Sequence, residues 1–395
     1  MRRKEFKVAL VHDWLTGMRG GEKCLEVLCA FFPRATLFTI FHHLGAMSPI
    51  IENMEIRTSW IADLPFAQKH FRNYLPLFPA AVESFNLSDY QLIISTSHCV
   101  AKGVIPAPDA LHLSYIHTPM RYIWEMYPHY LGSSNNPLKR LAGPIIASML
   151  RTWDVASCNR VDYFIANSQN VRRRIQRHYR RDAEVIHPPV DTDLFQPTSS
   201  PGDYFLIVTA LVPYKQVGLA IEAFNRLGEP LLIVGDGPEK GKLMRLARPN
   251  IEFTSWKSPE ELRDIYSGSK ALIFPGEEDF GIVPLEAQAC GRPVIAYGRG
   301  GVLETVIPVE GQTQPEKDEG DQPTGIFFYE PTPEALIAAV KKLDSIEFDP
   351  DAIRRQALSF SKPIYKGKMA DFINARLEEK FGRRDDLPRI ILDDE

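Results

Sequence analysis

The stretch of sequence that decides the fold is ALIFPGEEDFGIVPLEAQACGRPVIAY, which runs from Ala271 to Tyr297. It starts with a β-branched and aromatic run that ends at Pro275, and a second apolar run begins at Pro293. Three acids and a helix-like segment that opens near Gly281 separate the two runs. Near-continuous apolar strands with a helix between them are typical of a parallel sheet covered on both faces. The stretch therefore predicts part of an α/β domain.

The same alternation of short apolar runs and helical segments extends along the whole chain. The expected strands lie at 7–11, 36–41, 91–96, 113–117 and 161–166 in the first half, and at 204–208, 230–234, 250–253, 271–274, 293–297 and 325–329 in the second. Strands that alternate with helices indicate a parallel sheet. We therefore expect the α/β fold class, formed twice.

The alternation is interrupted at HPPVDTDLFQPTSSPGDY, residues 187–204, which contains four prolines and several small polar residues. This composition is typical of a linker. We therefore expect a first domain over residues 1–190 and a second over residues 200–362. A C-terminal helix at about 363–385 is expected to pack back on the first domain, and the polar stretch 310–325 is expected to be a surface loop.

Composition narrows the class of protein. The chain has 395 residues, of which 44% are hydrophobic and 24% charged, with a formal net charge of -4. These values are typical of a soluble globular protein, and they lack the basic surplus of a nucleic-acid-binding protein. The five cysteines are odd in number, scattered and embedded in apolar segments, which favours free thiols in a reducing, cytoplasmic compartment. We find no apolar run that approaches the ~20 residues of a membrane span.

The acids of the opening stretch suggest a ligand. If a helix begins near Ile282, its first backbone N–H groups are unpaired and suit a phosphate. Glu278 precedes those groups, and Glu286 lies up to ~12 Å further along at ~1.5 Å rise per residue. A carboxylate beside a phosphate is repelled unless it accepts hydrogen bonds from neutral hydroxyls, as a nucleotide sugar would provide. The alternative is a helix-dipole acid together with an exposed helical glutamate.

A family resemblance favours the first interpretation. Glu278, Phe280, Gly281 and Glu286 resemble the E-x7-E signature of retaining glycosyltransferase family 4. Further segments resemble the bacterial O-antigen and exopolysaccharide mannosyltransferase branch of that family, namely residues 12–23, 97–104, 115–125, 210–224 and 231–239. The resemblance implies two Rossmann-like domains that face each other across a cleft, the GT-B arrangement.

The resemblance implies a donor site in the second domain. Lys215 would contact the diphosphate and act in catalysis, although an exposed surface lysine is the alternative interpretation. Glu278 would hold sugar hydroxyls as a further catalytic residue, and Glu286 would hold the ribose. The other implied donor-binding residues are Gly235 and Gly237 beside the nucleotide, Trp256 and Lys257 near the base, and Phe280, Gly281 and Ile282 at the diphosphate.

One position departs from the family pattern. The family usually carries an arginine where this chain has Ala210. The change removes a cation from the diphosphate site, so either Arg121 or Arg299 substitutes for it or turnover is weaker.

The first domain is expected to contribute a glycine loop and a histidine. Gly20 and Gly21 lie ahead of a helix that starts near Glu22 and allow close backbone approach to the donor, although a plain flexible loop is the alternative. His117 ends an apolar strand, and the resemblance implies that this catalytic residue contacts the transferred sugar. His12 and His98 end other strands and are weaker candidates, either on the acceptor side or structural.

Two further segments do not indicate a particular ligand. The segment DTD, Asp191 to Asp193, lies in the linker, where aspartates commonly stabilise turns, and we interpret it as a turn and not as a metal site. We therefore expect no metal and no cofactor. The segment 170–181 carries six arginines, with Val171, Ile175 and Tyr179 at four-residue spacing. It could lie on an anionic membrane as a peripheral contact, or it could be a solvated helix packed by this narrow apolar stripe.

These observations predict a hexosyltransferase that acts with retention by same-face displacement. The branch resemblance favours GDP-mannose as donor and a lipid-linked saccharide as acceptor, in the assembly of O-antigen or exopolysaccharide. UDP-glucose or another UDP-hexose is the alternative donor, and a non-catalytic sugar-nucleotide-binding protein is the alternative of another class. A nicotinamide-dependent oxidoreductase is disfavoured, because the turn GDGPE at 235–239 lacks the third glycine of the dinucleotide fingerprint.

Overall fold

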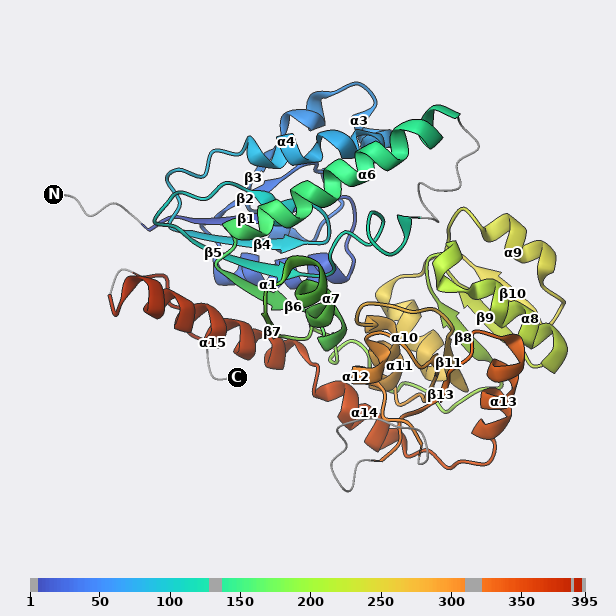
Figure 1. Cartoon of the computed structure of the whole chain (residues 1–395). Coiled ribbons are helices and arrows are strands. Elements are labelled where there is room, and N and C mark those ends of the chain that lie inside the picture. The colour runs from blue at the N-terminus through green and yellow to red at the C-terminus, as the bar shows by residue number, and fades with distance from the viewer. Residues whose placement is uncertain (1–5, 128–136, 310–321, 385–386, 393–395) are drawn as a thin grey trace. The chain divides into compact units, whose positions relative to one another are not determined.

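The computed structural model describes residues 6–127, 137–309, 322–384 and 387–392. The expected loop at 310–325 lies largely outside the described residues, which omit 310–321. The chain divides into two compact units, Met1–Pro188 with Lys366–Glu395, and Pro189–Tyr365. Each unit is built on one parallel sheet (Figure 1).

The described part of the first unit contains a seven-stranded parallel sheet with the strand order β3-β2-β1-β4-β5-β6-β7. The strands are β1 (Val8–His12), β2 (Thr36–Thr39), β3 (Glu55–Thr58), β4 (Leu92–Ser97), β5 (Leu111–Ile116), β6 (Tyr163–Ala166) and β7 (Ala183–Val185). Every residue of β1, β2, β4 and β5 is buried, because helices cover both faces of the sheet. The edge strands β3 and β7 were not predicted from the sequence.

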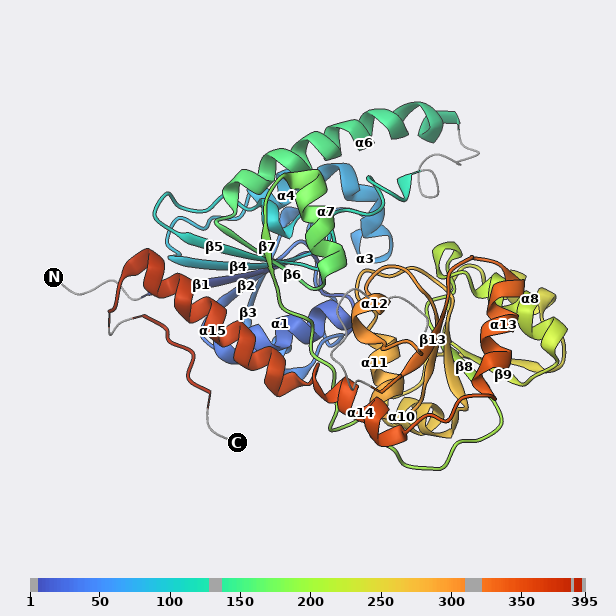
Figure 2. The ribbon, with the colours of Figure 1, turned by 60° about the horizontal axis from the view of Figure 1, so that its bottom comes forward.

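Helices cover both faces of this sheet. They are α1 (Gly20–Phe31), α2 (Pro49–Glu52), α3 (Ala67–His70), α4 (Phe78–Glu83), α6 (Pro137–Ser157), α7 (Gln169–Tyr179) and α15 (Lys362–Phe381), with the 3-10 turns η1 (Trp60–Asp63), η2 (Phe71–Leu77), η3 (Ala101–Gly103) and η4 (Cys158–Arg160). Side chains of α4 and α6 share one core cluster with Val11 and Ile93 of the sheet. Figure 2 shows α1 and α15 on the opposite face. Near the end of α15, Tyr163 donates a hydrogen bond to Glu379 at 2.7 Å.

The described part of the second unit contains a six-stranded parallel sheet with the order β10-β9-β8-β11-β12-β13. The strands are β8 (Phe205–Val208), β9 (Leu231–Val234), β10 (Ile251–Thr254), β11 (Ala271–Phe274), β12 (Val294–Tyr297) and β13 (Gly325–Phe328). The helices are α8 (Val217–Leu227), α9 (Lys240–Leu246), α10 (Pro259–Gly268), α11 (Ile282–Ala289), α12 (Val302–Thr305), α13 (Pro333–Leu343) and α14 (Pro350–Leu358), with the turn η5 (Pro213–Lys215). Successive residues of β8 enter different core clusters, Phe205 with α8 and α13, and Leu206 with α11.

The predicted fold class, α/β formed twice with parallel sheets, is confirmed. In both sheets the strand order reverses beside the first strand, between β1 and β4 and between β8 and β11. Ligands of open parallel sheets bind outside the carboxyl ends of the strands at such a switch point. Ligand-binding groups are therefore expected in the loops after β1, β4, β8 and β11.

The five cysteines are also placed as expected. All of them are free and buried. Burial raises the pKa of Cys29 and of Cys158 to about 12, so that these thiols stay protonated at neutral pH.

Candidate functional site

An ion pair lies at the switch point of the second unit. Lys215 ends the turn η5 after β8, and Glu278 lies in the loop after β11. The ammonium of Lys215 and a carboxylate oxygen of Glu278 are in direct contact, and the two side chains are 14% and 25% exposed. The sequence-predicted diphosphate ligand and sugar ligand are thus brought together. Lys215 is not the fully exposed surface lysine of the alternative interpretation.

The loop that carries Glu278 is held by two glycines. Gly301 donates its N–H to the carbonyl oxygen of Glu278 at 2.9 Å. A Cβ atom on Gly300 would lie 2.2 Å from that same oxygen, and one on Gly301 would lie 2.3 Å from the Cα atom of Phe280. Only glycine permits such an approach. Sequence reasoning missed this pair, although the run GRGG at 298–301 directly after a strand could have indicated it.

Helix α11 begins beside this loop, as the sequence predicted. Gly281 precedes it with φ +97°, and the helix has neither a side-chain cap nor an acid in its first turn. Its first N–H groups therefore keep their capacity to hold an anion. Phe280 is buried in the core and Ile282 packs against that core, so these two side chains serve packing. These two residues can therefore contact a ligand only through their backbone groups.

Glu286 lies on the buried side of α11. Its side chain accepts a hydrogen bond from the hydroxyl of Tyr266 at 3.0 Å. Burial raises the pKa of Tyr266 well above its ordinary value, with the carboxylate of Glu286 as a further cause, so that the phenol remains a donor. Glu286 is only 8% exposed, and the alternative of an exposed helical glutamate is therefore wrong.

Gly235 and Gly237 allow two loops to touch. A Cβ atom on Gly235 would lie 1.9 Å from the carbonyl oxygen of Thr209, and one on Gly237 would lie 2.3 Å from that of Leu211. The loop after β9 therefore packs on the backbone that flanks Ala210. This packing accounts for both glycines without a ligand.

Trp256 and Lys257 follow β10. The indole is 51% exposed, while its backbone N–H lies 3.3 Å from the carboxylate of Asp236. Lys257 forms an ion pair of 3.3 Å with Glu261 in the first turn of α10. The exposed aromatic face is suited to stacking on a base. The ammonium of Lys257 already has a partner.

The two arginines considered as substitutes at Ala210 lie in different units. Arg299 is exposed and directly precedes the glycines that support the Glu278 loop. Arg121 belongs to the first unit. Arg299 thus lies on the same unit as Lys215 and Glu278.

The switch point of the first unit contains a buried carboxylate, Asp13. It accepts hydrogen bonds from four consecutive backbone N–H groups, those of residues 98, 99, 100 and 101, at 2.6, 2.9, 2.7 and 2.8 Å. The ring nitrogen Nδ1 of His98 lies 3.1 Å from the same carboxylate. These amides would otherwise suit an external anion. In this unit the protein supplies the anion itself.

The start of α1 is also occupied by a carboxylate. Glu22 accepts a hydrogen bond from the backbone of Arg19 at 3.0 Å, and its other oxygen lies 3.5 Å from Nε2 of His12. Burial alone would raise the pKa of Glu22, but hydrogen bonding and the charge of His12 outweigh it and lower the pKa to about 2. The carboxylate is therefore ionised in the first turn of α1. The opposite ring nitrogen of His12 contacts the hydroxyl of Thr96 at 2.6 Å.

The predicted helix start near Glu22 is wrong by two residues, because α1 begins at Gly20, so Gly20 and Gly21 form its first turn and not a loop. His117 lies against this first turn. A Cβ atom on Gly21 would be 3.3 Å from its Nε2, and among the described residues this buried nitrogen has no hydrogen-bond partner. Burial, followed by the charges of His12 and His98, lowers the pKa of His117 to about 3, so the ring is neutral at physiological pH. Ring centroids lie 6.5 Å apart for His98 and His117, and 6.3 Å apart for His12 and His98. The three predicted histidines thus form one cluster, with Asp13 and Glu22 added by the structure.

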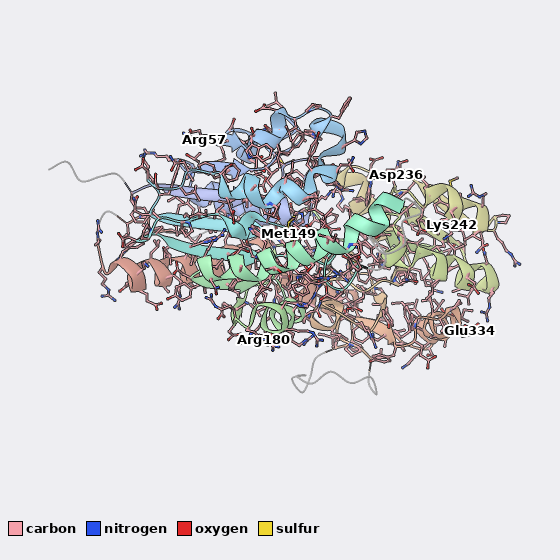
Figure 3. All side chains as sticks on the ribbon, turned by 45° about the horizontal axis from the view of Figure 1, so that its top comes forward. Arg57, Met149, Arg180, Asp236, Lys242 and Glu334 are labelled. Atoms are coloured by element: carbon pink, nitrogen blue, oxygen red, sulfur yellow. The ribbon has the colours of Figure 1, made fainter. Side chains whose placement is uncertain are left out.

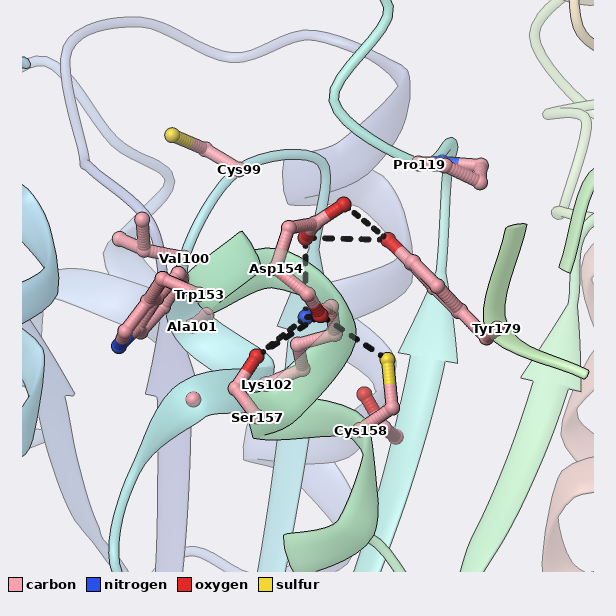
Figure 4. Close-up of polar contacts among 12 residues, drawn as sticks. Cys99, Val100, Ala101, Lys102, Pro119, Trp153, Asp154, Ser157, Cys158 and Tyr179 are labelled. Carbon is pink, nitrogen blue, oxygen red and sulfur yellow. Dashed lines mark hydrogen bonds and ion pairs between the residues drawn. The ribbon is translucent and has the colours of Figure 1, made fainter. Parts of the chain in front are cut away.

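A buried ion pair fixes the loop whose amides hold Asp13 (Figure 4). The ammonium of Lys102 lies 2.9 Å from the carboxylate of Asp154 and donates to Ser157 at 2.6 Å. Tyr179 and Trp124 donate to the same carboxylate at 3.0 and 2.8 Å. A buried ion pair needs such additional hydrogen bonds to offset its desolvation. The cluster is satisfied internally, and we interpret it as structural.

The arginine-rich segment forms α7, which is a packed helix. Val171, Ile175 and Tyr179 lie in a core cluster of the first unit. Arg172 pairs with Asp182 at 2.9 Å, and Arg174 pairs with Glu125. The apolar stripe is therefore not available for insertion into a lipid surface, and the alternative of a helix packed by that stripe holds.

The segment DTD forms a turn. A side-chain oxygen of Asp191 accepts the N–H of Leu194 at 3.1 Å, and its carbonyl accepts that of Phe195 at 2.9 Å. Within the described residues no cluster of three or more histidine, cysteine or acidic side chains could hold a metal ion.

Two doubly wound parallel sheets, each with polar groups gathered at its switch point, agree with the two Rossmann-like domains that the GT-B class requires. A family model described as Glycosyltransferase Family 4 matches residues 2–194, and one described as Glycosyl transferases group 1 matches residues 191–359. The chain therefore belongs to the GT-B glycosyltransferase family.

Curated relatives match part of the chain. An uncharacterized glycosyltransferase of Methanocaldococcus jannaschii is 31% identical over 153 residues, which cover 37% of this chain and 43% of that protein. A D-inositol 3-phosphate glycosyltransferase of Mycolicibacterium smegmatis is 30% identical over 162 residues, which cover 35% of this chain and 37% of that protein. The chain thus matches less than half the length of these relatives.

Solved structures match nearly the whole chain in fold. Sucrose-phosphate synthase from Thermosynechococcus elongatus superposes with a TM-score of 0.69 at 17% identity, and the match covers 95% of this chain and 100% of that chain. Anabaena HepE in complex with UDP-glucose superposes with a TM-score of 0.66 at 16% identity, covering 93% of this chain and 99% of that one. At such identities the likeness shows the fold. Within the described residues no helix is long and apolar enough to cross a membrane.

Proposed function

We propose that the chain is a retaining glycosyltransferase that transfers a hexose from a nucleotide sugar to an acceptor hydroxyl. The observation that carries the proposal is the contact between Lys215 and Glu278 at the switch point of the second unit, beside the uncapped start of α11. A cation and free helix amides suit a diphosphate, and a carboxylate suits sugar hydroxyls. A nucleotide sugar carries both groups in one molecule.

The second unit would stabilise the leaving diphosphate. Lys215 ends a turn after β8, and α11 begins without a side-chain cap. Bound to the diphosphate, this ammonium and the first amides of α11 would stabilise the negative charge that develops as the sugar leaves. Glu278 would hold the hexose hydroxyls, and Glu286, oriented by Tyr266, would hold the ribose. In a same-face displacement the donor phosphate accepts the proton of the acceptor hydroxyl.

The first unit would receive the neutral acceptor. The amide groups that could bind a second anion are occupied by Asp13, and the start of α1 is occupied by Glu22. A neutral His117 with an unpartnered Nε2 can exchange one hydrogen bond with a hydroxyl. These features favour a polyhydroxylated acceptor over a phosphate on this unit.

The test of the proposed activity is the release of nucleoside diphosphate. We expect the purified protein to release GDP or UDP from a nucleotide sugar when a lipid-linked saccharide is added. The variant Glu278→Gln should keep its fold, as judged by circular dichroism, and lose release by about a hundredfold or more, because a placed charge is worth several kcal/mol in a transition state. Full activity in this variant would contradict the assignment. Donor binding without release would favour the non-catalytic alternative.

The donor that we propose is GDP-mannose, on the branch resemblance of the sequence. UDP-glucose is the alternative, and the structurally similar HepE was solved with that molecule. The exposed indole of Trp256 can stack on either base. A thermal-shift comparison separates them, because the tighter ligand raises the apparent stability more. A larger shift with GDP than with UDP supports mannose transfer, and the reverse order supports the alternative.

We propose a lipid-linked acceptor in the assembly of a bacterial surface polysaccharide, reached by peripheral contact with an anionic membrane. This contact would use α6 rather than α7. From residue 142 onward the exposed positions of α6 carry no charge, and they include Ile145, Met149 and Val155. Figure 3 labels Met149 on this helix. Exposed apolar side chains on one helix suit contact with a lipid surface. Replacing Ile145 and Met149 by serine should reduce sedimentation with phosphatidylglycerol vesicles, while Arg177→Gln in α7 should change it little. The reverse result would contradict this assignment.

A further inference from the structure

We propose that Glu278 makes the second unit discriminate between an intact nucleotide sugar and the spent nucleoside diphosphate, by competing with the diphosphate for Lys215. The inference rests on the proposed function and concerns the same site. It assigns to Glu278 a role in product release in addition to its contact with the sugar.

The contact between Lys215 and Glu278 is the starting point. Their side chains are only 14% and 25% exposed, so the ion pair is partly withdrawn from water and is screened less than a surface pair. A bound diphosphate would bring a second anion to the same ammonium. Two anions on one cation repel each other unless neutral donors separate them.

An intact donor supplies those neutral donors. Hexose hydroxyls can donate to the carboxylate of Glu278 while the diphosphate takes Lys215. After transfer the hexose is gone, and once the proton taken from the acceptor hydroxyl has passed to water, the terminal phosphate carries one more negative charge, beside a carboxylate that has lost its hydroxyl partners. Glu278 then pairs with Lys215 again, and the protein binds the diphosphate more weakly than the intact donor.

Backbone contacts hold both members of the pair in place. A Cβ atom on Gly276 would lie 3.0 Å from the Cα atom of Lys215, so the two loops are already in contact. The N–H of Lys215 donates to Val212 at 3.1 Å, and the carbonyl of Glu278 accepts from Gly301 at 2.9 Å. With the backbone held in this way, rearrangement of the two side chains is the simplest response to a bound diphosphate. The discrimination is therefore built into the position of the carboxylate.

The experiment compares affinities by isothermal titration calorimetry for GDP, UDP, GDP-mannose and UDP-glucose. In Glu278→Gln we expect the diphosphate that the protein prefers to bind roughly tenfold tighter or more, the effect of removing one like charge a few ångströms from a phosphate. The affinity for the matching nucleotide sugar should stay equal or fall. The ratio of the two affinities is the readout, and its change should shrink at high salt.

The neighbouring acid provides a matched control. Glu277→Gln removes the same charge one residue away and leaves the contact between Lys215 and Glu278 in place, so it should keep the wild-type ratio. Glu278→Ala, checked by circular dichroism, should repeat the tighter binding of the diphosphate if the glutamine variant folds poorly. An unchanged ratio in both Glu278 variants overturns the inference alone. Failure of the wild-type protein to bind any of the four ligands overturns the proposed function.

Discussion

The two switch points share one topology and differ in charge. In the first unit, Asp13 and Glu22 occupy the amides at the carboxyl ends of the strands. In the second unit, Lys215 lies beside a helix start that has no side-chain cap. A doubly wound sheet offers an anion site wherever a helix follows a strand. Which unit binds the anion is therefore decided by a few loop side chains and not by the sheet.

The largest expected effect is on stability and concerns the first switch point. Asp13→Ala leaves four buried N–H groups without their acceptor, and we expect a loss of about 3–5 kcal/mol in the free energy of unfolding. Urea denaturation followed by circular dichroism measures it. Asp63→Asn, at an exposed acid of the same unit, should change the stability little. A stable Asp13→Ala variant would show that these amides are satisfied in another way.

A smaller effect is expected at the second switch point, and it concerns binding. Lys215→Met should weaken the binding of a nucleoside diphosphate by about 1.5–3 kcal/mol, the usual contribution of a hydrogen bond to a charged group. The free energy of unfolding should change far less, because the ion pair is partly exposed. Calorimetric titration and urea denaturation give the two numbers. Equal losses in both would mean that Lys215 is structural.

The smallest effect concerns pH. All ten histidines of the sequence precede residue 189, so titration of histidines near neutral pH is confined to the first unit. The pKa of His117 is lowered to about 3 from an ordinary value of 6.5, so below pH 6.5 the unfolded chain binds a proton that the folded chain does not. Stability is therefore full above pH 6.5 and falls as the pH drops, by about 1 kcal/mol near pH 5.5 for one such group.

The variant His117→Gln should reduce that dependence. We expect a shallower decrease in the free energy of unfolding between pH 7.5 and pH 5.5, measured by urea denaturation at each pH. His70→Gln, at an exposed histidine, should leave the slope as it is. An identical slope in the His117 variant and the wild-type protein would contradict the burial of a neutral ring.

The sequence predicted those parts of the fold that bury apolar side chains on both sheet faces. The two strands that it missed are β3, with mostly exposed residues, and β7, with three residues. Both are edge strands, and an edge strand needs no continuous apolar run. Strand prediction therefore failed where burial, its physical basis, was absent.

The candidate site was predictable where its residues lie on one segment. Glu278, Gly281 and Glu286 share one loop and helix. Their spacing allowed either a ligand site or a helix-dipole acid, and the family resemblance favoured the ligand site. Asp13 escaped notice because its partners lie 85 to 88 positions away and meet it only through the pairing of β1 with β4. Gly235 was predicted to lie beside the nucleotide, and the structure adds a packing reason for glycine there that the sequence did not show, because a Cβ atom would lie 1.9 Å from the carbonyl oxygen of Thr209.

The burial of every cysteine has a practical consequence. Thiol-directed dyes need an accessible thiolate, which the native thiols do not offer at neutral pH. One cysteine placed at an exposed position without a proposed role, such as Met244 in α9, would then be the single labelled site, in a background that needs no prior replacements. The chain is thus ready for fluorescence measurements of how its loops respond to added nucleotides.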